Sequence, residues 1–464
     1  MSKNSSLKRN IIRFIIPLML ANLLQVFYSA ADTMVVSLSC EPDAVGAIGT
    51  TTSMINLIVN IFIGCAVGAK VTISNAIGAG DEKRVQNSVH TAVLLSIILG
   101  FICTIIGIFV SEPVLRAMKN AERLLYLAKR YSVIYFCGGV FISLTNFASA
   151  VFHAKSDTKT PLKILIFCGF VNVVLNLFFV LVCKMSVEGV AISTVMSNAL
   201  SALLLLLRLG REKDICNLNI KKLRIEKNAC INILRCGIPA GVQSALFSVS
   251  HMVIQSSIVT VNNLVTPVGS SFAPVVKGCA ACASIEGFGS TAINAVSQAA
   301  ITFTGQNAGA KKYDEIKKVQ HSCYLFSFII SLCFAAVIFL LKDPLLMLYG
   351  ITRGNAGTLE ETAYNASVIR MMYMFIPYFF LGFMEVGSGV MQGLGKAFTS
   401  MSVSVLGSVI FRIIWIMTVF NTNPCLENIF VSFPISWIMT ATLHFIFIKL
   451  TLRTLKSSEY LIKK

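Results

Sequence analysis

Residues 85–111, VQNSVHTAVLLSIILGFICTIIGIFVS, run for 27 positions without an Asp, Glu, Lys or Arg side chain. A helix needs about 20 apolar residues to cross the hydrocarbon core of a bilayer, and it satisfies its own backbone hydrogen bonds there. The segment is therefore predicted to be a membrane-spanning helix. It follows the charged phrase NAIGAGDEKR at 75–84, which ends an earlier apolar block.

The rest of the chain has the same character. Its 464 residues are 55% hydrophobic and 13% charged, with a mean hydropathy of +0.77, and a water-soluble protein of this length needs more polar surface. Further uncharged blocks cover 164–183, 319–341 and 428–448. The first apolar stretch continues past Tyr28 without a small-residue cleavage site, so we expect a retained span and not a signal peptide. The sequence predicts an all-α, polytopic membrane protein.

Charged and glycine-rich breaks divide the chain into about twelve spans in two sets of six. We predict an N-lobe of helices 1–6 at 1–210, a cytoplasmic linker at 211–230, and a C-lobe of helices 7–12 at 231–464. The linker contains the longest polar stretch, REKDICNLNIKKLRIEKN. The predicted spans lie near 11–38, 46–76, 86–110, 124–152, 162–183, 187–209, 231–261, 277–305, 318–341, 365–391, 401–421 and 427–452.

The distribution of charge predicts the orientation. If the N-terminus is cytoplasmic, most of the Lys and Arg residues behind the net charge of +18 fall in cytoplasmic segments. This positive-inside pattern predicts a multi-pass protein of the cell membrane with both termini in the cytoplasm. We do not expect nucleic-acid binding, because the basic residues lie at span ends and form no separate domain.

The two halves repeat each other. NAIGAGDEKRVQN (75–87) resembles GQNAGAKKYDEIKKVQ (305–320) at an offset of 231, and VFHAKSDTKTP (151–161) pairs with VMQGLGKAFTS (390–400) at an offset of 239. These ordered correspondences predict two homologous bundles of about six helices in the same orientation, with a solute site near mid-membrane. The repeated glycines either latch the cytoplasmic face or simply cap helix ends.

Polar residues inside the N-lobe spans are candidate site residues. Asp32 lies near the middle of the first span, where an acid is costly and is functional by default, although it could also serve as a structural partner for neighbouring helices. Tyr28 lies one turn earlier on the same face. Asn172 and Asn176 share a helical face and either bind solute or join helices. Asn146 and Thr194 are weaker candidates from their position alone.

The C-lobe contains acids in apolar stretches, Glu286 and Glu385, for which we favour a functional role. Gln243 and Gln255 either line a cavity or bond between helices. Among the basic residues, Arg412 is a candidate counter-ion or snorkels to an interface, and we expect Lys70 to snorkel toward the nearby cytoplasmic loop. Prolines inside spans predict bends that could act as hinges: Pro17, Pro239 and Pro377.

No enzyme motif is present. The segment GAGDEKR lacks the Gly-Lys-Ser/Thr ending of a phosphate loop, and the chain contains no serine nucleophile elbow, no HExxH motif and no second CxxC pair to complete a zinc site. We therefore predict neither catalysis nor a metal site.

In order and spacing, several segments over nearly the whole chain resemble the multidrug and toxic compound extrusion family. They are the first span from Pro17 to Asp32, IGAGDEKR, HAKSDTKTP, GVAISTVMSN, IEGFGS with TFTGQNAGA, GVMQGLGK and FPISW. The resemblance implies twelve helices in two lobes around a V-shaped central cleft. It also implies antiport of organic, often cationic amphipathic compounds against H⁺ or Na⁺, with no other cofactor.

Within that family, the DNA-damage-inducible-F-like branch is the most similar. The resemblance matches its first-helix tyrosine and aspartate to Tyr28 and Asp32, and its N-lobe polar cluster to Asn146, Asn172, Asn176 and Thr194. Where the branch often has a second aspartate, this chain has Asn176, which leaves Asp32 as the lone strong titratable group of the lobe. The tenth-helix aspartate of another branch falls near Leu381, so its role is not transferred to Glu385. Residues 262–278 match the family poorly.

Two alternatives to drug efflux remain at this point. A lipid-linked saccharide flippase of the same superfamily tends to carry extra spans and an arginine-rich cavity, and a membrane sensor needs a soluble output domain. We favour an antiporter with a small-molecule organic substrate, embedded in the lipid bilayer and functional as a monomer.

Overall fold

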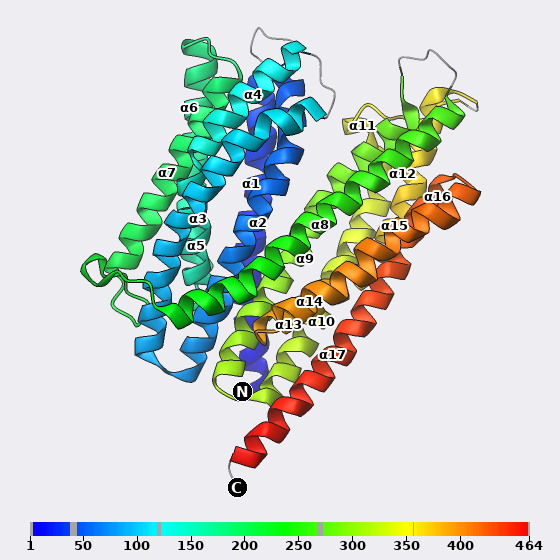
Figure 1. Ribbon diagram of the computed structural model, residues 1–464. Helices are drawn as coiled ribbons and strands as arrows, with labels where there is room; N and C mark the ends of the chain where they lie inside the picture. Colours follow the sequence, from blue (N-terminus) through cyan, green and yellow to red (C-terminus); the bar gives the residue numbers. More distant parts are fainter. Residues whose placement is uncertain (1–2, 38–43, 118–121, 267–271, 356, 463–464) are drawn as a thin grey trace.

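The computed structural model describes residues 3–37, 44–117, 122–266, 272–355 and 357–462, and no strand occurs among them. Helices α1 to α7 form one lobe and α8 to α17 the other (Figure 1). The N-lobe helices are α1 (Lys3–Ser37), α2 (Ala44–Ala79), α3 (Glu82–Ala117), α4 (Glu122–Cys137), α5 (Gly139–Ala154), α6 (Lys159–Leu177), the π-helix η1 (Phe178–Val182) and α7 (Val187–Arg211).

The C-lobe begins with a 39-residue helix that crosses obliquely from the N-lobe side of the molecule (Figure 1). Its helices are α8 (Lys227–Val265), α9 (Pro274–Gly309), α10 (Tyr313–Leu340), α11 (Lys342–Leu348), α12 (Leu359–Phe375), α13 (Tyr378–Gly393), α14 (Ala397–Ser404), α15 (Phe411–Trp415), α16 (Leu426–Phe430) and α17 (Ser432–Ile462). The π-helices η3 (Val405–Ile410) and η4 (Ile416–Phe420) flank α15.

The helices match the predicted spans closely. In the described part of the chain, nine helices are long and apolar enough to cross a membrane, and the number rises to eleven when each of two bent pairs counts as one span. The one predicted span outside this count is the eighth, at 277–305, which is α9 and carries many small and polar side chains. It packs against helices of both lobes, including α1, α2, α10, α12 and α13. Because protein covers so much of it, α9 needs less apolar surface than a lipid-facing helix.

The bends confirm that the lobes are related. Helices α4 and α5 meet at an angle of 51° on either side of Gly138, and α12 and α13 meet at 47° around Pro377. These two positions are 239 residues apart, which is the offset of the second sequence repeat. The predicted hinge at Pro377 is therefore a real break. In contrast, α1 and α8 continue as α-helices through Pro17 and Pro239.

The helix ends show the same duplication. Gly80 and Lys311 have positive φ angles of 70° and 55°, and they are 231 positions apart. Ser156 and Gly395 have φ angles of 67° and 74°, at an offset of 239. Left-handed residues just past a helix end let the chain reverse direction, so both halves stop these helices by the same means.

The repeated glycines Gly78 and Gly309 serve a different purpose from capping. A Cβ atom on Gly78 would lie 1.8 Å from the Gln306 carbonyl oxygen, and one on Gly309 would lie 1.9 Å from that of Asn75. Both partners precede the corresponding glycine by three residues, so each half makes the same contact on the other. The Gly-Ala motif occurs in both halves because α2 and α9 cross with their backbones touching, near the end of the molecule where both termini lie (Figure 1).

Other contacts tie the lobes at this end. The Gln306 side-chain amide donates to the Ala154 carbonyl oxygen at 2.8 Å and lies 3.1 Å from the Ser156 hydroxyl. Further along α2, a Cβ atom on Gly64 or Gly68 would likewise clash with the backbone of α8, so these two helices also touch through their backbones. Away from this end, the lobes diverge (Figure 1).

The segment between the lobes is attached to the N-lobe. Helix α7 ends at Arg211 and α8 begins at Lys227, four residues before the predicted start of the C-lobe at 231. The Asn219 backbone amide donates to Nε2 of His90 at 3.1 Å, and Cys216 and Leu218 join the N-lobe core. Residues 267–271, within the stretch that matches the family poorly, lie outside the described residues.

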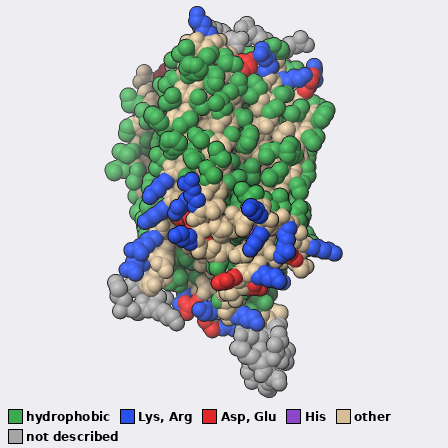
Figure 2. Space-filling model, turned by 90° about the vertical axis from the view of Figure 1, so that its left-hand side faces the viewer, with side chains coloured by type: hydrophobic (Ala, Val, Ile, Leu, Met, Phe, Trp, Pro, Cys, Tyr) green, Lys and Arg blue, Asp and Glu red, His purple; other side chains and the backbone are tan. Residues whose placement is uncertain are grey.

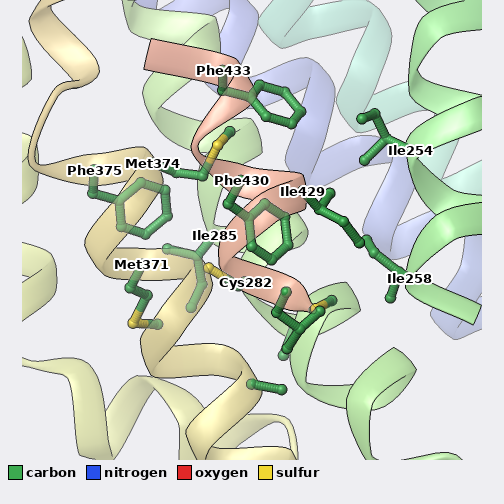
Figure 3. Close-up of a cluster of buried hydrophobic side chains, with 14 of the residues drawn as sticks. Ile254, Ile258, Cys282, Ile285, Met371, Met374, Phe375, Ile429, Phe430 and Phe433 are labelled. Carbon is green, nitrogen blue, oxygen red and sulfur yellow. The ribbon is translucent and has the colours of Figure 1, made fainter. Parts of the chain in front are cut away.

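The outer surface suits a bilayer. Figure 2 shows a broad apolar face and, below it, a band of Lys and Arg side chains at the end that carries the termini. Inside the C-lobe, aromatic and sulfur-containing side chains from α9, α12, α13, η4, α16 and α17 form a tight core, seen in Figure 3 around Phe430, Phe433 and Phe375. This core supports the charged residues described below.

Candidate functional site

Asp32 meets the predicted amides in the N-lobe. The Asn176 Nδ2 on α6 donates to Asp32 Oδ1 on α1 at 2.5 Å, and it lies 3.3 Å from Asn172 Oδ1. Asn172 in turn donates to the Ser197 hydroxyl of α7 at 3.3 Å. A chain of neutral donors therefore links the carboxylate to two neighbouring helices. In the described part of the chain, Asp32 forms no ion pair.

The remaining N-lobe candidates bond elsewhere. The Tyr28 hydroxyl donates to the Ile166 carbonyl oxygen at 3.4 Å, and its ring packs against Gly169, where any Cβ atom would clash with it. Thr194 donates to Val190 O at 2.9 Å and Asn146 donates to Ile142 O at 2.8 Å, both within their own helices. None of these three side chains bonds to Asp32, but Asn146 lines a cavity described below.

The C-lobe holds a cavity of about 740 Å³ lined by three of the four predicted residues, Gln243, Glu286 and Glu385. Gln255 is exposed and is not part of this lining, so the prediction that it lines this cavity is wrong. It lies twelve positions after Gln243 on α8, an offset that rotates its side chain by about 120° from that of Gln243.

Glu286 forms an ion pair that the sequence did not predict. Its carboxylate accepts from Arg370 of α12 at 2.9 Å, and both side chains are at most 15% exposed. The same guanidinium donates to the Cys279 carbonyl oxygen at 3.0 Å and lies over the Phe430 ring. Arg370 stands near the start of a predicted span, where it is easily taken for an interface residue.

Gln243 joins helices. Its amide lies 3.3 Å from the Ser388 hydroxyl and 3.2 Å from that of Ser404, and Ser404 contacts Nε2 of His444 at 3.1 Å. This network connects α8, α13, α14 and α17. The Gln243 amide is therefore mainly occupied by protein groups, as expected for an interhelical amide.

Neither Glu385 nor Arg412 forms an ion pair with a described residue, although the charge of Glu286 acts on Arg412. The Arg412 Nε donates to the Ser436 hydroxyl at 2.9 Å, and its guanidinium carbon lies 4.1 Å from the centre of the Phe433 ring. This residue is only 2% exposed, so it does not snorkel. The Glu385 carboxyl makes no hydrogen bond in the described part of the chain and faces the cavities between the lobes.

These cavities adjoin one another between the two lobes. A second one, of about 600 Å³, lies between α1, α9 and α13 and shares Leu381 and Glu385 with the C-lobe cavity. A third, of about 310 Å³, reaches into the N-lobe and shares Asn22, Gln25 and Asn294 with the second. The molecule thus has a central, amide-rich space. Asp32 does not line any of the three, and it lies one turn beyond Ser29, which does.

Within the residues that the structure describes, no group of three or more His, Cys, Asp or Glu side chains is arranged to hold a metal ion. The chemistry of the site is therefore that of separate carboxylates, amides and cations facing a shared space.

The MatE family model matches residues 17–178 and 239–418, which cover most of both lobes. The chain belongs to the MatE family. The two matched segments begin at Pro17 and Pro239 and so coincide with the internal repeat. MatE is the multidrug and toxic compound extrusion family that the sequence resembles.

Curated MatE relatives are distant but similar in length. The probable multidrug resistance protein YoeA of Bacillus subtilis is 25% identical over 86% of this chain and 84% of its own length. The probable multidrug resistance protein NorM of Thermotoga maritima is 22% identical over 86% and 83%.

Solved structures share the fold. A structure titled as MATE in the straight conformation has a TM-score of 0.85 and 21% identity, covering 98% of this chain and all of that one. A structure titled as the outward-facing conformation of a multidrug resistance MATE family transporter has a TM-score of 0.85 and 20% identity over 98% and 99%. These matches confirm the predicted two-lobed membrane fold.

Proposed function

We propose that this MatE protein is a secondary antiporter that exports organic, often cationic amphipathic compounds in exchange for H⁺ or Na⁺. Asp32 is the coupling carboxylate. The observation that carries the proposal is the environment of Asp32: an acid within a membrane span whose hydrogen-bond partner is the neutral Asn176. An acid in such a place binds a proton or a cation readily, because the protein supplies no opposite charge.

Helix α1 can transmit the change in charge. It packs against α6 on the Asp32 side and against α9 of the C-lobe, where the Asn22 amide donates to the Thr291 carbonyl oxygen at 3.4 Å. Asn22, Gln25 and Ser29 of the same helix line the central space. When H⁺ or Na⁺ occupies Asp32, the bond to Asn176 weakens, α1 shifts and the solute affinity of that space falls. Exchange follows because each ligand favours a different arrangement.

The orientation is also part of the proposal. If both termini are cytoplasmic, as the basic band in Figure 2 supports, the end closed by the α2–α9 crossing faces the cytoplasm. The cavities then open outward, and the protein resides in the cell membrane as a functional monomer. The relatives named above are described as multidrug resistance proteins, which supports drug export and gives no support to the flippase alternative.

Proteoliposomes test the coupling role directly. We expect D32N to lose uphill efflux of a cationic dye under either a pH or a Na⁺ gradient, while the protein remains folded and still binds dye. The separate gradients identify the ion. D314N, which changes an exposed acid at the start of α10, serves as the matched control. Uphill efflux by D32N at the wild-type rate would remove Asp32 from the mechanism.

A further inference from the structure

Lys70 on α2 is a buried lysine whose amine has no hydrogen-bond partner among the described residues. Its side chain is only 2% exposed, and it makes no hydrogen bond or ion pair with any described residue. The expectation that it snorkels to the loop is wrong, because the stem points into the protein and the amine faces the 310 Å³ cavity. A buried charge without compensation is strongly unfavourable. This position therefore favours a ligand of opposite charge.

The cavity around Lys70 suits such a ligand. Among the described residues, its lining contains no Asp or Glu, and Lys70 and His153 are its basic side chains. Asn146, Asn198 and Gln298 line the same space, with Gln298 contributed by α9 of the other lobe. The Asn146 and Asn198 amides each donate one N–H to a backbone carbonyl oxygen of their own helix, at 2.8 and 2.9 Å, so each has a second N–H for a ligand. Side-chain amides can donate to an anion, and an ammonium adds a charge-assisted hydrogen bond.

We propose that Lys70 and these amides form a subsite for a carboxylate group on the transported solute. This inference rests on the proposed export function and specifies its substrate class. One ammonium matches the single charge of a carboxylate, whereas a doubly charged phosphate would keep one charge unmatched.

The adjoining cavity of about 600 Å³ supplies an acidic side chain that can bind a positively charged group of the same solute. It shares Asn22, Gln25 and Asn294 with the Lys70 cavity and is lined by the unpartnered Glu385. One solute lying across both cavities can place a carboxylate at Lys70 and an ammonium toward Glu385. The substrates that the whole space fits best are zwitterionic organic compounds.

Two dyes that differ by one charge test the subsite. Rhodamine 110 carries a free carboxylate, and rhodamine 123 is its methyl ester. Their binding to the purified full chain in lipid nanodiscs is measured by fluorescence anisotropy, without an ion gradient. The variants are K70M, which removes the charge, K70Q, which removes it but keeps a polar group, and K70R, which retains it. K163M, at an exposed position near the start of α6, is the control.

We expect the wild type to bind rhodamine 110 more tightly than rhodamine 123. K70M and K70Q should weaken rhodamine 110 binding by about 10- to 100-fold, the range for a lost charge-assisted hydrogen bond, with little change for rhodamine 123. K70R and K163M should retain the wild-type preference. Equal affinities of the two dyes for the wild type, or equal losses for both dyes in K70M and K70Q, would overturn the proposal.

The outcome is independent of the coupling mechanism. The binding assay needs no gradient, so a failed Asp32 test with intact dye selectivity rejects the coupling role alone. Lost selectivity with normal Asp32-dependent efflux rejects the carboxylate subsite alone.

Discussion

Replacing Gly309 with Ala should loosen the end of the molecule at which the lobes touch. The new Cβ atom would lie 1.9 Å from the Asn75 carbonyl oxygen, whereas Cβ contacts below 3.0 Å essentially do not occur. Helices α2 and α9 must therefore separate by about 1 Å at this point, and no flexible side chain can absorb the shift, because the obstacle is backbone.

The size of the effect follows from the packing. Forcing an extra methyl group into a close-packed contact costs about 1–3 kcal/mol. If this cost destabilises the arrangement in which the lobes touch, the population of open states at this end rises by about 5- to 150-fold. Because the contact is reciprocal, G78A should act alike, and the double variant should cost less than the sum of the two.

Amide hydrogen exchange measures this opening. In nanodiscs, G309A should exchange the amides of 71–80 and 301–312 faster than the wild type by the same factor, while the C-lobe core around Phe430 keeps its protection. G287A is the matched control, because it lies in the same helix and a Cβ atom there meets nothing within 4 Å. Unchanged exchange in G309A, or the same acceleration in G287A, would refute the reasoning.

Two further predictions concern stability. E286Q should lower the free energy of unfolding by about 3–5 kcal/mol, because it leaves the Arg370 charge buried and uncompensated. The double variant E286L/R370M should recover much of that loss, because it removes both charges. Denaturant unfolding in detergent compares the variants, and equal stability of E286Q and the wild type would contradict the ion-pair assignment. At the start of α8, the Glu226 carboxylate accepts from the backbone amides of Asn228 and Ala229 at 3.1 and 2.6 Å, and these bonds lower its pKa from the usual 4.5. Because the pKa of Glu226 is lower in the folded state, its hydrogen bonds contribute their full stabilisation above about pH 4.5. This stabilisation is lost as the pH falls through the lowered pKa. The thermal destabilisation of E226A should accordingly be present at pH 7 and shrink below pH 4, and a difference that grows with acid would show that the cap is not the cause.

The helices were predictable because the bilayer allows little else. Every lipid-facing span must be long, apolar and helical, so the blocks at 85–111 and 319–341 could be recognised one at a time. Helix α9 was predicted from its length and from the glycine-rich, charged segment GQNAGAKK at its end. Of the three prolines, Pro377 lies at a break between two helices, whereas α1 and α8 run without a break through Pro17 and Pro239.

The site was only partly predictable. Asp32 and Asn176 stood out as polar residues in apolar surroundings, but their contact joins residues 144 positions apart. The ion pair of Glu286 and Arg370 spans 84 positions and depends on how two helices rotate against each other. Gln255 and Lys70 show the same limit, since one was expected inside a cavity and faces outward, and the other was expected at an interface and is buried.

By itself, the sequence determined a twelve-span, duplicated membrane protein, because span length and repeat offset are properties of the chain alone. Only the tertiary structure decided which polar side chains face one another and which charges lack a partner. Those depend on helix rotation and on the backbone contact between α2 and α9, and both are set by packing between segments far apart in the chain.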